Sequence, residues 1–476
     1  MVGRTMECKK LLEALKSEHS EFVVVYGRRR VGKTFLVRET FDYKFSFQHT
    51  GHSTGKMPEQ LLYFRESLLD AGYEDCPVLK TWHAAFRHLQ KFLEARSEPR
   101  KTVFIDELPF MATHKSGCVA ALEHFWNGWA TARKDIVLIV CGSAASWLLK
   151  KIIGDKGGLH NRVTKKIHLS PFSLAECEQM ADEMKLGYSR KQIAECYMAI
   201  GGIPYYWSFL QKGLSVQQNM DQLFFAEDAG LKTEYDELYR ALFDSPEPYM
   251  RIVEALGRHG GGLTRDEIAQ SAKLSPCGTF TRYLDNLEKC GFITRYRQFG
   301  ADVKGAMYWL TDNYTLFYFQ FVAENIDGDP HFWTDSLEAP FRRTWMGLAY
   351  ERLCLKHIPQ IKAALGIAGV RTSVSSWSHR ADERYPEGAQ IDLLIDRADD
   401  VINICEMKFC NGSYAIDKGY AKSLANKLQA FRTVTGTKKG LHLTFVTVGG
   451  VAHNSYWSDV QSEVTLDDLF KLCLGG

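Results

Sequence analysis

The stretch from Phe22 to Thr34, FVVVYGRRRVGKT, decides the N-terminal fold. Residues 22–26 are a short run of β-branched and aromatic side chains, which predicts a strand buried on both faces. Gly27 to Thr34 match the pattern G-x-x-x-x-G-K-T, and a helical stretch follows from Thr34 to about Thr40. A strand, this loop and a helix in that order are the context in which such a loop binds nucleotide phosphates.

Each residue of the loop has a predicted task. Gly27 and Gly32 let backbone N–H groups curl around phosphate oxygens at the start of a helix. Lys33 is predicted to reach the β- and γ-phosphates of ATP, and the Thr34 hydroxyl to ligate Mg²⁺. The arginines at positions 28–30 either add positive potential there or are solvated and paired with acids, and the second interpretation is favoured.

A second motif, which contains two acidic residues, lies in residues 102–110, TVFIDELPF. An apolar strand ends there in Asp106, predicted to hold Mg²⁺, and in Glu107, predicted to orient or activate the attacking water. Residues 135–143, DIVLIVCGS, predict another strand, with Ser143 placed to sense the γ-phosphate. With a further strand at 43–48, the sequence predicts an α/β, doubly wound, mainly parallel sheet that binds ATP at its carboxyl edge.

Several segments in order resemble the archaeal-type prokaryotic P-loop ATPases of the AAA+/STAND-like class. They are residues 1–15, 103–111, 160–176 (HNRVTKKIHLSPFSLAE) and 201–207 (GGIPYYW). The resemblance covers about residues 1–240 and implies an ATPase core at 1–170 and a helical lid at 171–240. It also implies a central strand between the phosphate-loop strand and the Asp106 strand, a sensor at Ser143, and that Arg162 answers to the γ-phosphate. A surface arginine remains the alternative for Arg162.

Residues 241–327 predict three helices followed by a β-hairpin, which is the pattern of a winged helix-turn-helix. Thr264 and Glu267 have the spacing of a capping box at the second helix. The predicted DNA contacts are Thr279, Arg282 and Asn286 on the third helix and Arg295 and Arg297 on the wing. Because the same fold also serves as a lid or partner-docking module, DNA binding stays one of two interpretations.

Residues 328–476 resume α/β character. Residues 388–409, GAQIDLLIDRADDVINICEMKF, predict two strands at 390–397 and 401–409 joined by a turn at 398–400. An antiparallel hairpin with that turn pairs positions whose numbers sum to about 798, which sets Asp392 opposite Glu406. Glu406 and Lys408 are two residues apart and share a face. Two carboxylates can hold divalent ions that polarise a phosphate, and a lysine can stabilise the developing charge.

These residues resemble the PD-(D/E)XK nuclease fold, with Asp392, Glu406 and Lys408 in the D…E-x-K positions. Ile391 stands in place of the proline of that pattern. Apart from the resemblance, Glu351 on a preceding helix is a candidate third Mg²⁺ ligand; the resemblance adds Gln429 as a polar residue of the following helix. A sheet with an acidic edge, where Lys408 merely pairs with Glu406, is the alternative.

Composition sets wider bounds. The 476 residues exceed what one core accommodates, so several domains are expected. The formal charge of +2 neither demands nor excludes nucleic acid. Twelve scattered cysteines without C-x-x-C, no secretory leader and no apolar run of about 20 residues lead us to expect a cytoplasmic protein without a membrane partner.

Two hypotheses follow. The first is an ATPase that acts on or is regulated by nucleic acid, DNA favoured, with a Mg²⁺-dependent nuclease effector at its C-terminus and a possible homo-oligomeric state. The second is a nucleotide-dependent regulator or scaffold whose winged helix binds DNA or a partner and whose nuclease-like domain is inactive. A P-loop kinase is disfavoured, because paired acids after a strand suit water activation better than transfer to an acceptor.

Overall fold

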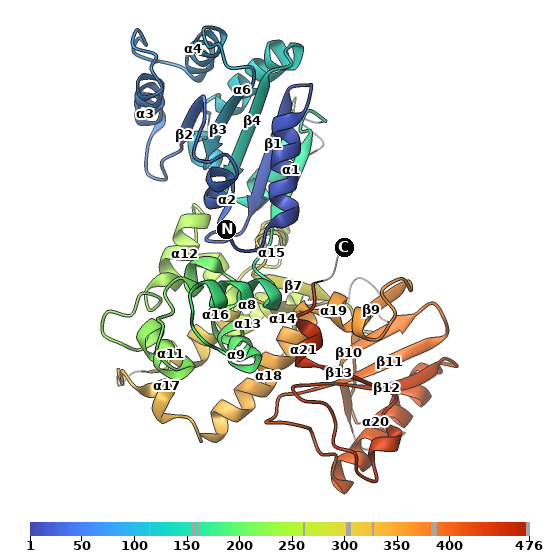
Figure 1. Ribbon diagram of the computed structural model, residues 1–476. Helices are drawn as coiled ribbons and strands as arrows, with labels where there is room; N and C mark the ends of the chain where they lie inside the picture. Colours follow the sequence, from blue (N-terminus) through green and yellow to red (C-terminus); the bar gives the residue numbers. More distant parts are fainter. Residues whose placement is uncertain are drawn as a thin grey trace. The chain divides into compact units, whose positions relative to one another are not determined.

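The computed structural model describes residues 1–472 except 114, 155–158, 160, 260, 261, 301–305, 326, 327 and 382–387. The chain divides into two compact units. The N-terminal unit consists of Met1–Pro171 with Leu238–Asp244, and the C-terminal unit of Phe172–Glu237 with Ser245–Gly476. In Figure 1 the blue and teal segments belong to the N-terminal unit, and most of the C-terminal unit runs from green to red.

A five-stranded sheet forms the centre of the N-terminal unit (Figure 1). Its order is β2-β3-β4-β1-β5, and every neighbouring pair is parallel. The strands are β1 (Glu21–Gly27), β2 (Phe47–Thr50), β3 (Lys101–Asp106), β4 (Ile136–Gly142) and β5 (Lys165–Leu169). The predicted α/β fold with a mainly parallel sheet is therefore confirmed, and β4 lies between β1 and β3 as the resemblance implied.

The strand expected at 43–48 begins later, at Phe47. Asp42 and Tyr43 have φ values of 51° and 57°, so the chain turns there and cannot yet extend.

Helices cover both faces of this sheet. They are α1 (Thr5–Lys16), α2 (Lys33–Thr40), α3 (Met57–Asp70), α4 (Trp82–Glu94), α5 (Leu108–Met111), α6 (Cys118–Gly128) and α7 (Ala145–Leu148), with a 3₁₀ turn at Ala130–Ala132 and a π turn at Leu149–Ile153. On one face, Phe64, Trp82 and Trp126 from α3, α4 and α6 share a core with Phe22 and Val24 of β1. The alternate β1 residues are also buried and face α1 and α2.

The C-terminal unit begins with a helical region. Its elements are α8 (Leu174–Glu183), α9 (Arg190–Ile200), α10 (Pro204–Trp207), α11 (Val216–Phe224), α12 (Glu234–Leu242, which continues into the N-terminal unit), α16 (Asn313–Phe317), a π turn at Tyr318–Val322, α17 (Phe332–Asp335), α18 (Pro340–Lys356) and α19 (Ile358–Ala364). Ser173, Ser189 and Ser215 each start a helix with a capping box. Gly202 packs so closely that a Cβ there would lie 1.9 Å from the Phe172 carbonyl oxygen.

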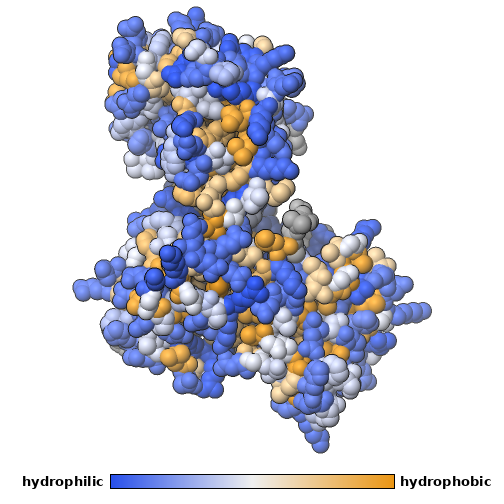
Figure 2. Space-filling model, viewed as in Figure 1, coloured by the Kyte–Doolittle hydropathy of each residue, from blue (hydrophilic) through white to orange (hydrophobic). Residues whose placement is uncertain are grey.

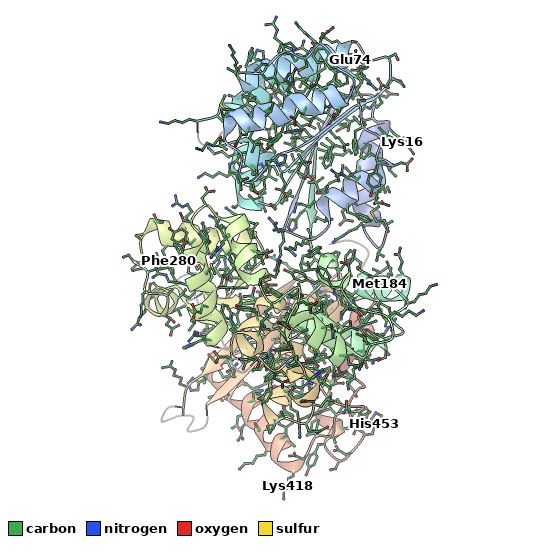
Figure 3. All side chains as sticks on the ribbon, turned by 90° about the vertical axis from the view of Figure 1, so that its left-hand side faces the viewer. Lys16, Glu74, Met184, Phe280, Lys418 and His453 are labelled. Carbon is green, nitrogen blue, oxygen red and sulfur yellow. The ribbon has the colours of Figure 1, made fainter. Side chains whose placement is uncertain are left out.

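Three helices and a three-stranded antiparallel sheet occupy the segment from 247 to 310. The helices are α13 (Glu247–Arg258), α14 (Arg265–Ser271) and α15 (Gly278–Lys289), and the sheet order is β6-β8-β7, with β6 at Leu263–Thr264, β7 at Ile293–Tyr296 and β8 at Met307–Leu310. Thr264 and Glu267 form the predicted capping box. Phe280, labelled in Figure 3, lies on α15. Residues 301–305, which the sequence places between β7 and β8, lie outside the described part of the chain.

The chain after β7 joins this segment to the C-terminal sheet. The Phe299 N–H donates to the Ser376 carbonyl at 2.8 Å, and Gln298 Nε2 donates to the Ser378 hydroxyl at 3.1 Å. The Phe299 ring lies 5.1 Å from the Phe431 ring. The region after β7 is therefore held against the edge of the next sheet.

That sheet has the order β13-β12-β11-β10-β9. Its strands are β9 (Thr372–His379), β10 (Ala389–Arg397), β11 (Val401–Lys408), β12 (Gly440–Thr447) and β13 (Ser462–Thr465), accompanied by α20 (Lys418–Thr435), a 3₁₀ turn at Trp457–Asp459 and α21 (Leu466–Leu469). β10 is antiparallel to β9 and β11, whereas β11, β12 and β13 are parallel. Leu393 faces Cys405 and Asp396 faces Ile402, so the predicted sum of 798 is confirmed.

The two faces of this sheet pack differently. Ile402 and Ile404 of β11 share a core with Ala430 and Phe431 of α20, whereas α18 also packs on β11. By alternation, Glu406 extends toward the α20 face. Alternation is interrupted in β10, where the register with β9 shifts between Ile391 and Leu394 and both residues enter the α20 core.

No helix within the described residues is long and apolar enough to cross a membrane. On the face in Figure 2, hydrophobic and hydrophilic residues are interspersed over the C-terminal unit. The eleven cysteines of the described part are all free thiols.

Candidate functional site

The glycine-rich loop follows β1, and its two glycines are required for different reasons. A Cβ at Gly27 would lie 2.2 Å from the Leu169 carbonyl oxygen of the adjacent strand β5. Gly32 precedes α2 with a φ of 88°, a left-handed conformation that glycine adopts at little cost, and an added Cβ would meet no atom within 4 Å. Gly27 thus permits close strand packing, and Gly32 permits the turn into the helix.

Lys33 is the first residue of α2 and is only 5% exposed. Its ammonium donates to the carbonyl oxygens of Gly27 at 3.1 Å and Arg28 at 2.8 Å. Burial lowers the pKa of Lys33, and the nearby carboxylates of Glu107 and Asp106 oppose that shift. The charge is therefore held inside the loop, at the place predicted for phosphates.

Thr34 and Asp106 meet directly, although 72 positions separate them in the chain. The Thr34 hydroxyl donates to Asp106 Oδ2 at 2.6 Å. Asp106 is 3% exposed, and burial raises its pKa while the Thr34 hydrogen bond opposes the rise. One hydroxyl and one buried carboxylate oxygen side by side are hard ligands of the kind that Mg²⁺ prefers.

Glu107 and Ser143 also meet at the carboxyl ends of β3 and β4. Ser143 donates to Glu107 Oε2 twice, from its backbone N–H at 3.0 Å and from its hydroxyl at 2.9 Å. Glu107 itself has a left-handed φ of 47°, which turns its side chain out of the strand direction. The predicted acid and the predicted sensor therefore form one hydrogen-bonded pair.

This donor set fits Mg·ATP. The Gly32 conformation leaves room for backbone N–H groups to face phosphates, Lys33 supplies a buried positive charge, and Thr34 with Asp106 supplies oxygen ligands.

The arginines of the loop lie beside this group, and the charge of Arg29 contributes to the lowered pKa of Lys33. Arg162 is exposed, and within the described residues its side chain has no hydrogen bond or ion pair. Of the loop arginines, Arg28 is buried, whereas Arg29 and Arg30 are half-buried.

A second polar group surrounds Glu406 in the C-terminal sheet. Glu406 is 5% exposed, and its Oε2 accepts the Tyr420 hydroxyl at 2.6 Å. Its Oε1 forms an ion pair with Lys427, and the Lys408 ammonium lies 3.6 Å from Oε2. Tyr420 and Lys427 belong to α20, which begins at Lys418, labelled in Figure 3. Burial and the Glu406 charge raise the pKa of Tyr420, so it stays a hydroxyl donor.

Glu351 and Asp392 form a neighbouring acidic pair. Burial, followed by the charge of Asp392, raises the pKa of Glu351 to about 7, while Lys408 acts in the opposite direction. Asp392 also accepts a hydrogen bond from Gln390 Nε2 at 2.6 Å. Trp309 of β8 lines the same small crevice as Glu351 and Asp392.

The predicted metal ligands Glu351, Asp392 and Glu406 do not form a cage in the arrangement described. No group of three or more His, Cys, Asp or Glu side chains in the described ranges is placed to hold a metal ion. The register shift in β10 interrupts the alternation that set Asp392 beside Glu406, and the Glu406 oxygens already have partners. As placed, these residues do not fit a bound metal.

Sequence reasoning missed the two α20 residues that hold Glu406. Gln429, expected on this helix, is exposed, and Lys427 reaches the carboxylate instead. Tyr420 and Lys427 are seven residues apart, so two helical turns place them on one face. That spacing, on the helix after the E-x-K strand, was the available signal.

The residues predicted to contact DNA lie in different surroundings. Thr279 and Arg282 of α15 are exposed, whereas the Asn286 amide donates to the Tyr249 hydroxyl at 2.8 Å. Arg295 lies 3.9 Å from the Glu288 carboxylate, and the exposed Arg297 lies where the chain joins β9. Asn286 is thus engaged in packing α15 against α13.

Comparisons with known proteins found a matching family model and similar proteins. Residues 1–209 match the family model described as an ATPase domain predominantly from Archaea. An uncharacterized protein of Methanocaldococcus jannaschii is 24% identical over 391 residues, covering 80% of this chain and 82% of that protein.

Two solved structures are also similar to this chain, at lower sequence identity. The Walker-type ATPase of Pyrococcus abyssi has a TM-score of 0.47 and 18% identity, covering 67% of this chain and 96% of that one. The ORC2 protein of Aeropyrum pernix, solved with ADPNP and ADP, has a TM-score of 0.40 and 14% identity, covering 75% and 95%. The family match and the site geometry agree, and residues 1–209 are similar to ATPase domains of the archaeal type.

Proposed function

We propose that this chain hydrolyses ATP at the carboxyl edge of its N-terminal sheet. The observation that carries the proposal is the joining of the two motifs through the 2.6 Å hydrogen bond from Thr34 to Asp106. Bound Mg·ATP supplies the phosphoryl group and a divalent charge that stabilises the transition state. Thr34 and Asp106 would hold the metal, and Lys33 would bind the phosphates in place of the loop carbonyls.

Glu107 is the group that accepts the proton of the attacking water. Ser143 fixes one of its carboxylate oxygens through two donors, which leaves Oε1 to face the water. We assign Ser143 the role of positioning Glu107, in addition to sensing the γ-phosphate. Arg162 is exposed, and we therefore assign it to the γ-phosphate of ATP bound to a neighbouring copy in a homo-oligomer.

Three variants test this assignment in the full chain. Lys33→Ala is expected to abolish binding of a fluorescent ATP analogue. Glu107→Gln is expected to bind it normally but release phosphate about 10²–10⁴-fold more slowly. Lys44→Ala, which removes an exposed lysine that pairs with Asp42, is the matched control and should behave as wild type. Unchanged turnover in Glu107→Gln would show that Glu107 does not accept the proton of the attacking water.

We propose further that the segment 241–327 is a winged helix that contacts duplex DNA through α15. The exposed Thr279 and Arg282 support this, and Asn286 is excluded from base contact by its bond to Tyr249. Arg282→Ala should weaken binding of a labelled duplex and lower the salt dependence of the affinity by about one counterion. Equal affinity and salt slope in both proteins would favour a protein-docking role instead.

The C-terminal domain, residues 328–476, is proposed as a candidate Mg²⁺-dependent nuclease with Asp392, Glu406, Lys408 and Glu351 at its centre. The charges of all three other residues act on Glu351, which supports one shared site. The test is incubation of plasmid with the protein, ATP and Mg²⁺ or Mn²⁺, beside Asp392→Ala and Lys408→Ala. If all three proteins leave DNA equally intact, the nuclease assignment fails.

The alternative is a nucleotide-dependent regulator with an inactive nuclease-like domain. One observation favours it: Lys427 and Tyr420 engage both oxygens of Glu406, and the described residues contain no group of three or more His, Cys, Asp or Glu placed to hold a metal ion. Under that function, the ATP-site variants would change DNA or partner binding without any cleavage.

A further inference from the structure

The edge strand β2 of the N-terminal sheet borders an open groove. β2 is the last strand in the sheet order, and within the described residues it pairs only with β3. Helix α3 lies beside β2 (Figure 1), and the groove along them has a volume of about 430 Å³. Lys33, Thr34, Asp106 and Glu107 do not line it, so the groove is separate from the candidate ATP site.

The main chain of β2 presents hydrogen-bonding groups at this edge. The N–H of Gly51, just after β2, donates to the Asp106 carbonyl of β3 at 2.9 Å. Because the main-chain groups of alternate residues point to opposite sides of a strand, the odd-numbered residues of β2 bond β3 as Gly51 does. The N–H and C=O groups of Gln48 and Thr50 therefore point toward the open edge, and both residues line the groove. Such an edge is a template for a further strand.

The two walls of the groove differ in chemistry. On the α3 side, Tyr63, Glu66 and Asp70 lie three or four positions apart and therefore share one face of the helix. Glu66 and Asp70 are exposed, and among the described residues neither carboxylate has a hydrogen bond or an ion pair. This wall thus carries two negative charges without a counter-charge.

The opposite wall is aromatic. Phe104 alternates with the β3 residues that enter the core under α3, so it lies on the other face of the sheet. Its ring lies 5.3 Å from the ring of Phe45, and both residues line the groove. Arg38 of α2 also lines the groove, so the acidic character belongs to the α3 wall alone.

We propose that this groove binds an extended segment of another protein, which adds a sixth strand to the sheet beside β2. Side chains of a strand alternate between the two faces of its sheet, so one set would meet the acids of α3 and the other set the aromatic wall. The segment therefore has basic side chains at alternate positions and apolar side chains between them. Main-chain bonds to Gln48 and Thr50 supply affinity, and the two walls supply selectivity.

Charge complementarity favours this occupant over a second copy of the chain. The β2 strand of a second copy, Phe-Gln-His-Thr, carries no Lys or Arg, so pairing two edges would leave the acids of both α3 helices without a counter-charge.

The test is binding of two labelled hexapeptides to the full chain, measured by fluorescence anisotropy. One alternates Val and Lys, the other alternates Val and Glu, and both have blocked ends. Wild type is expected to prefer the lysine peptide. Glu66→Gln combined with Asp70→Asn should bind the lysine peptide about three- to tenfold more weakly, because two exposed ion pairs are lost. Glu66→Lys combined with Asp70→Lys should reverse the preference.

Hydrogen exchange tests whether the peptide binds as a strand. The bound lysine peptide should slow exchange of the Gln48 and Thr50 amides about tenfold or more, because their N–H groups gain acceptors. The same peptide with every amide nitrogen methylated keeps its side chains but has no N–H donor, and it should not bind.

Glu74→Gln is the matched control, because Glu74, labelled in Figure 3, is an exposed acid of the same unit that does not line the groove. It should bind the lysine peptide as wild type does. The proposal is overturned if neither peptide binds, if the charge-reversed protein still prefers the lysine peptide, or if binding leaves the Gln48 and Thr50 amides unprotected. A dimer of the full chain that the lysine peptide dissociates would show that a second copy occupies the edge instead.

Discussion

Substituting the first glycine of the phosphate loop provides a sharp test of the N-terminal fold. In Gly27→Ala the new Cβ would lie 2.2 Å from the Leu169 carbonyl oxygen and 3.1 Å from its carbon, both backbone atoms of β5. The 2.2 Å contact is shorter than real Cβ atoms show, so β1 and β5 must separate. Overpacking costs about 1–3 kcal/mol, and the φ of 153° adds roughly 1–2 kcal/mol of strain.

The expected loss is therefore about 2–5 kcal/mol in the N-terminal unit. Hydrogen exchange of the full chain without nucleotide measures it, because protection of β1 and β5 amides should fall roughly 30- to 4,000-fold at about 1.4 kcal/mol per decade. Gly32→Ala is the matched control: its φ of 88° is strained but nothing lies within 4 Å, so a loss of about 1 kcal/mol is expected. Equal losses in the two variants would refute the argument from close packing.

Three further outcomes are expected. Gly202→Ala should destabilise the C-terminal unit by about 3 kcal/mol or more in urea unfolding, because its Cβ would meet the Phe172 carbonyl oxygen at 1.9 Å; a loss below 1 kcal/mol would contradict this. Burial lowers the pKa of His49 from 6.5 to about 3, so the unfolded chain gains a proton first as pH falls and the N-terminal unit should lose about 2 kcal/mol between pH 7.5 and 5. In His49→Gln the stability should no longer fall between pH 7.5 and 5. If it falls as in wild type, another group causes the pH dependence. Glu351, with its pKa raised from 4.5 to about 7, is protonated more readily in the folded state, so stability should fall as pH rises from 5 to 8, by roughly 2 kcal/mol. Thermal unfolding of Glu351→Gln at pH 5 and pH 8 should not show this loss of stability. Identical pH profiles of wild type and Glu351→Gln would contradict the prediction.

Local patterns predicted that the two N-terminal motifs lie close together, because both motifs lie at the ends of strands. The motifs around Lys33 and Asp106 are each continuous in sequence, and parallel strands bring their carboxyl ends to one edge whatever lies between them. The contact of Thr34 with Asp106 follows from that rule. What the pattern left out is the double bond from Ser143 to Glu107, which depends on the left-handed backbone of Glu107.

The C-terminal site was predicted less completely. The hairpin register around Leu393 and Cys405 followed from the position of the turn. The register shift between Ile391 and Leu394 could not be predicted in this way, because it arises in the pairing of β10 with β9, on the side away from the hairpin. Lys427 was missed because nothing in the E-x-K pattern specifies which face of a later helix meets the strand.

The sequence by itself determined the elements, the nucleotide loop and the order of chemical groups along the chain, since these depend on periodicity and on residues close together. Only the tertiary structure decided that Gly27 is required by strand β5 and that Glu406 is neutralised by Lys427. Both facts depend on segments that are distant in the sequence: β1 and β5 meet across 142 positions, and Glu406 and Lys427 meet across 21. In a close-packed interior an added Cβ has no free space, and a buried charge without a partner cannot be stabilised by water.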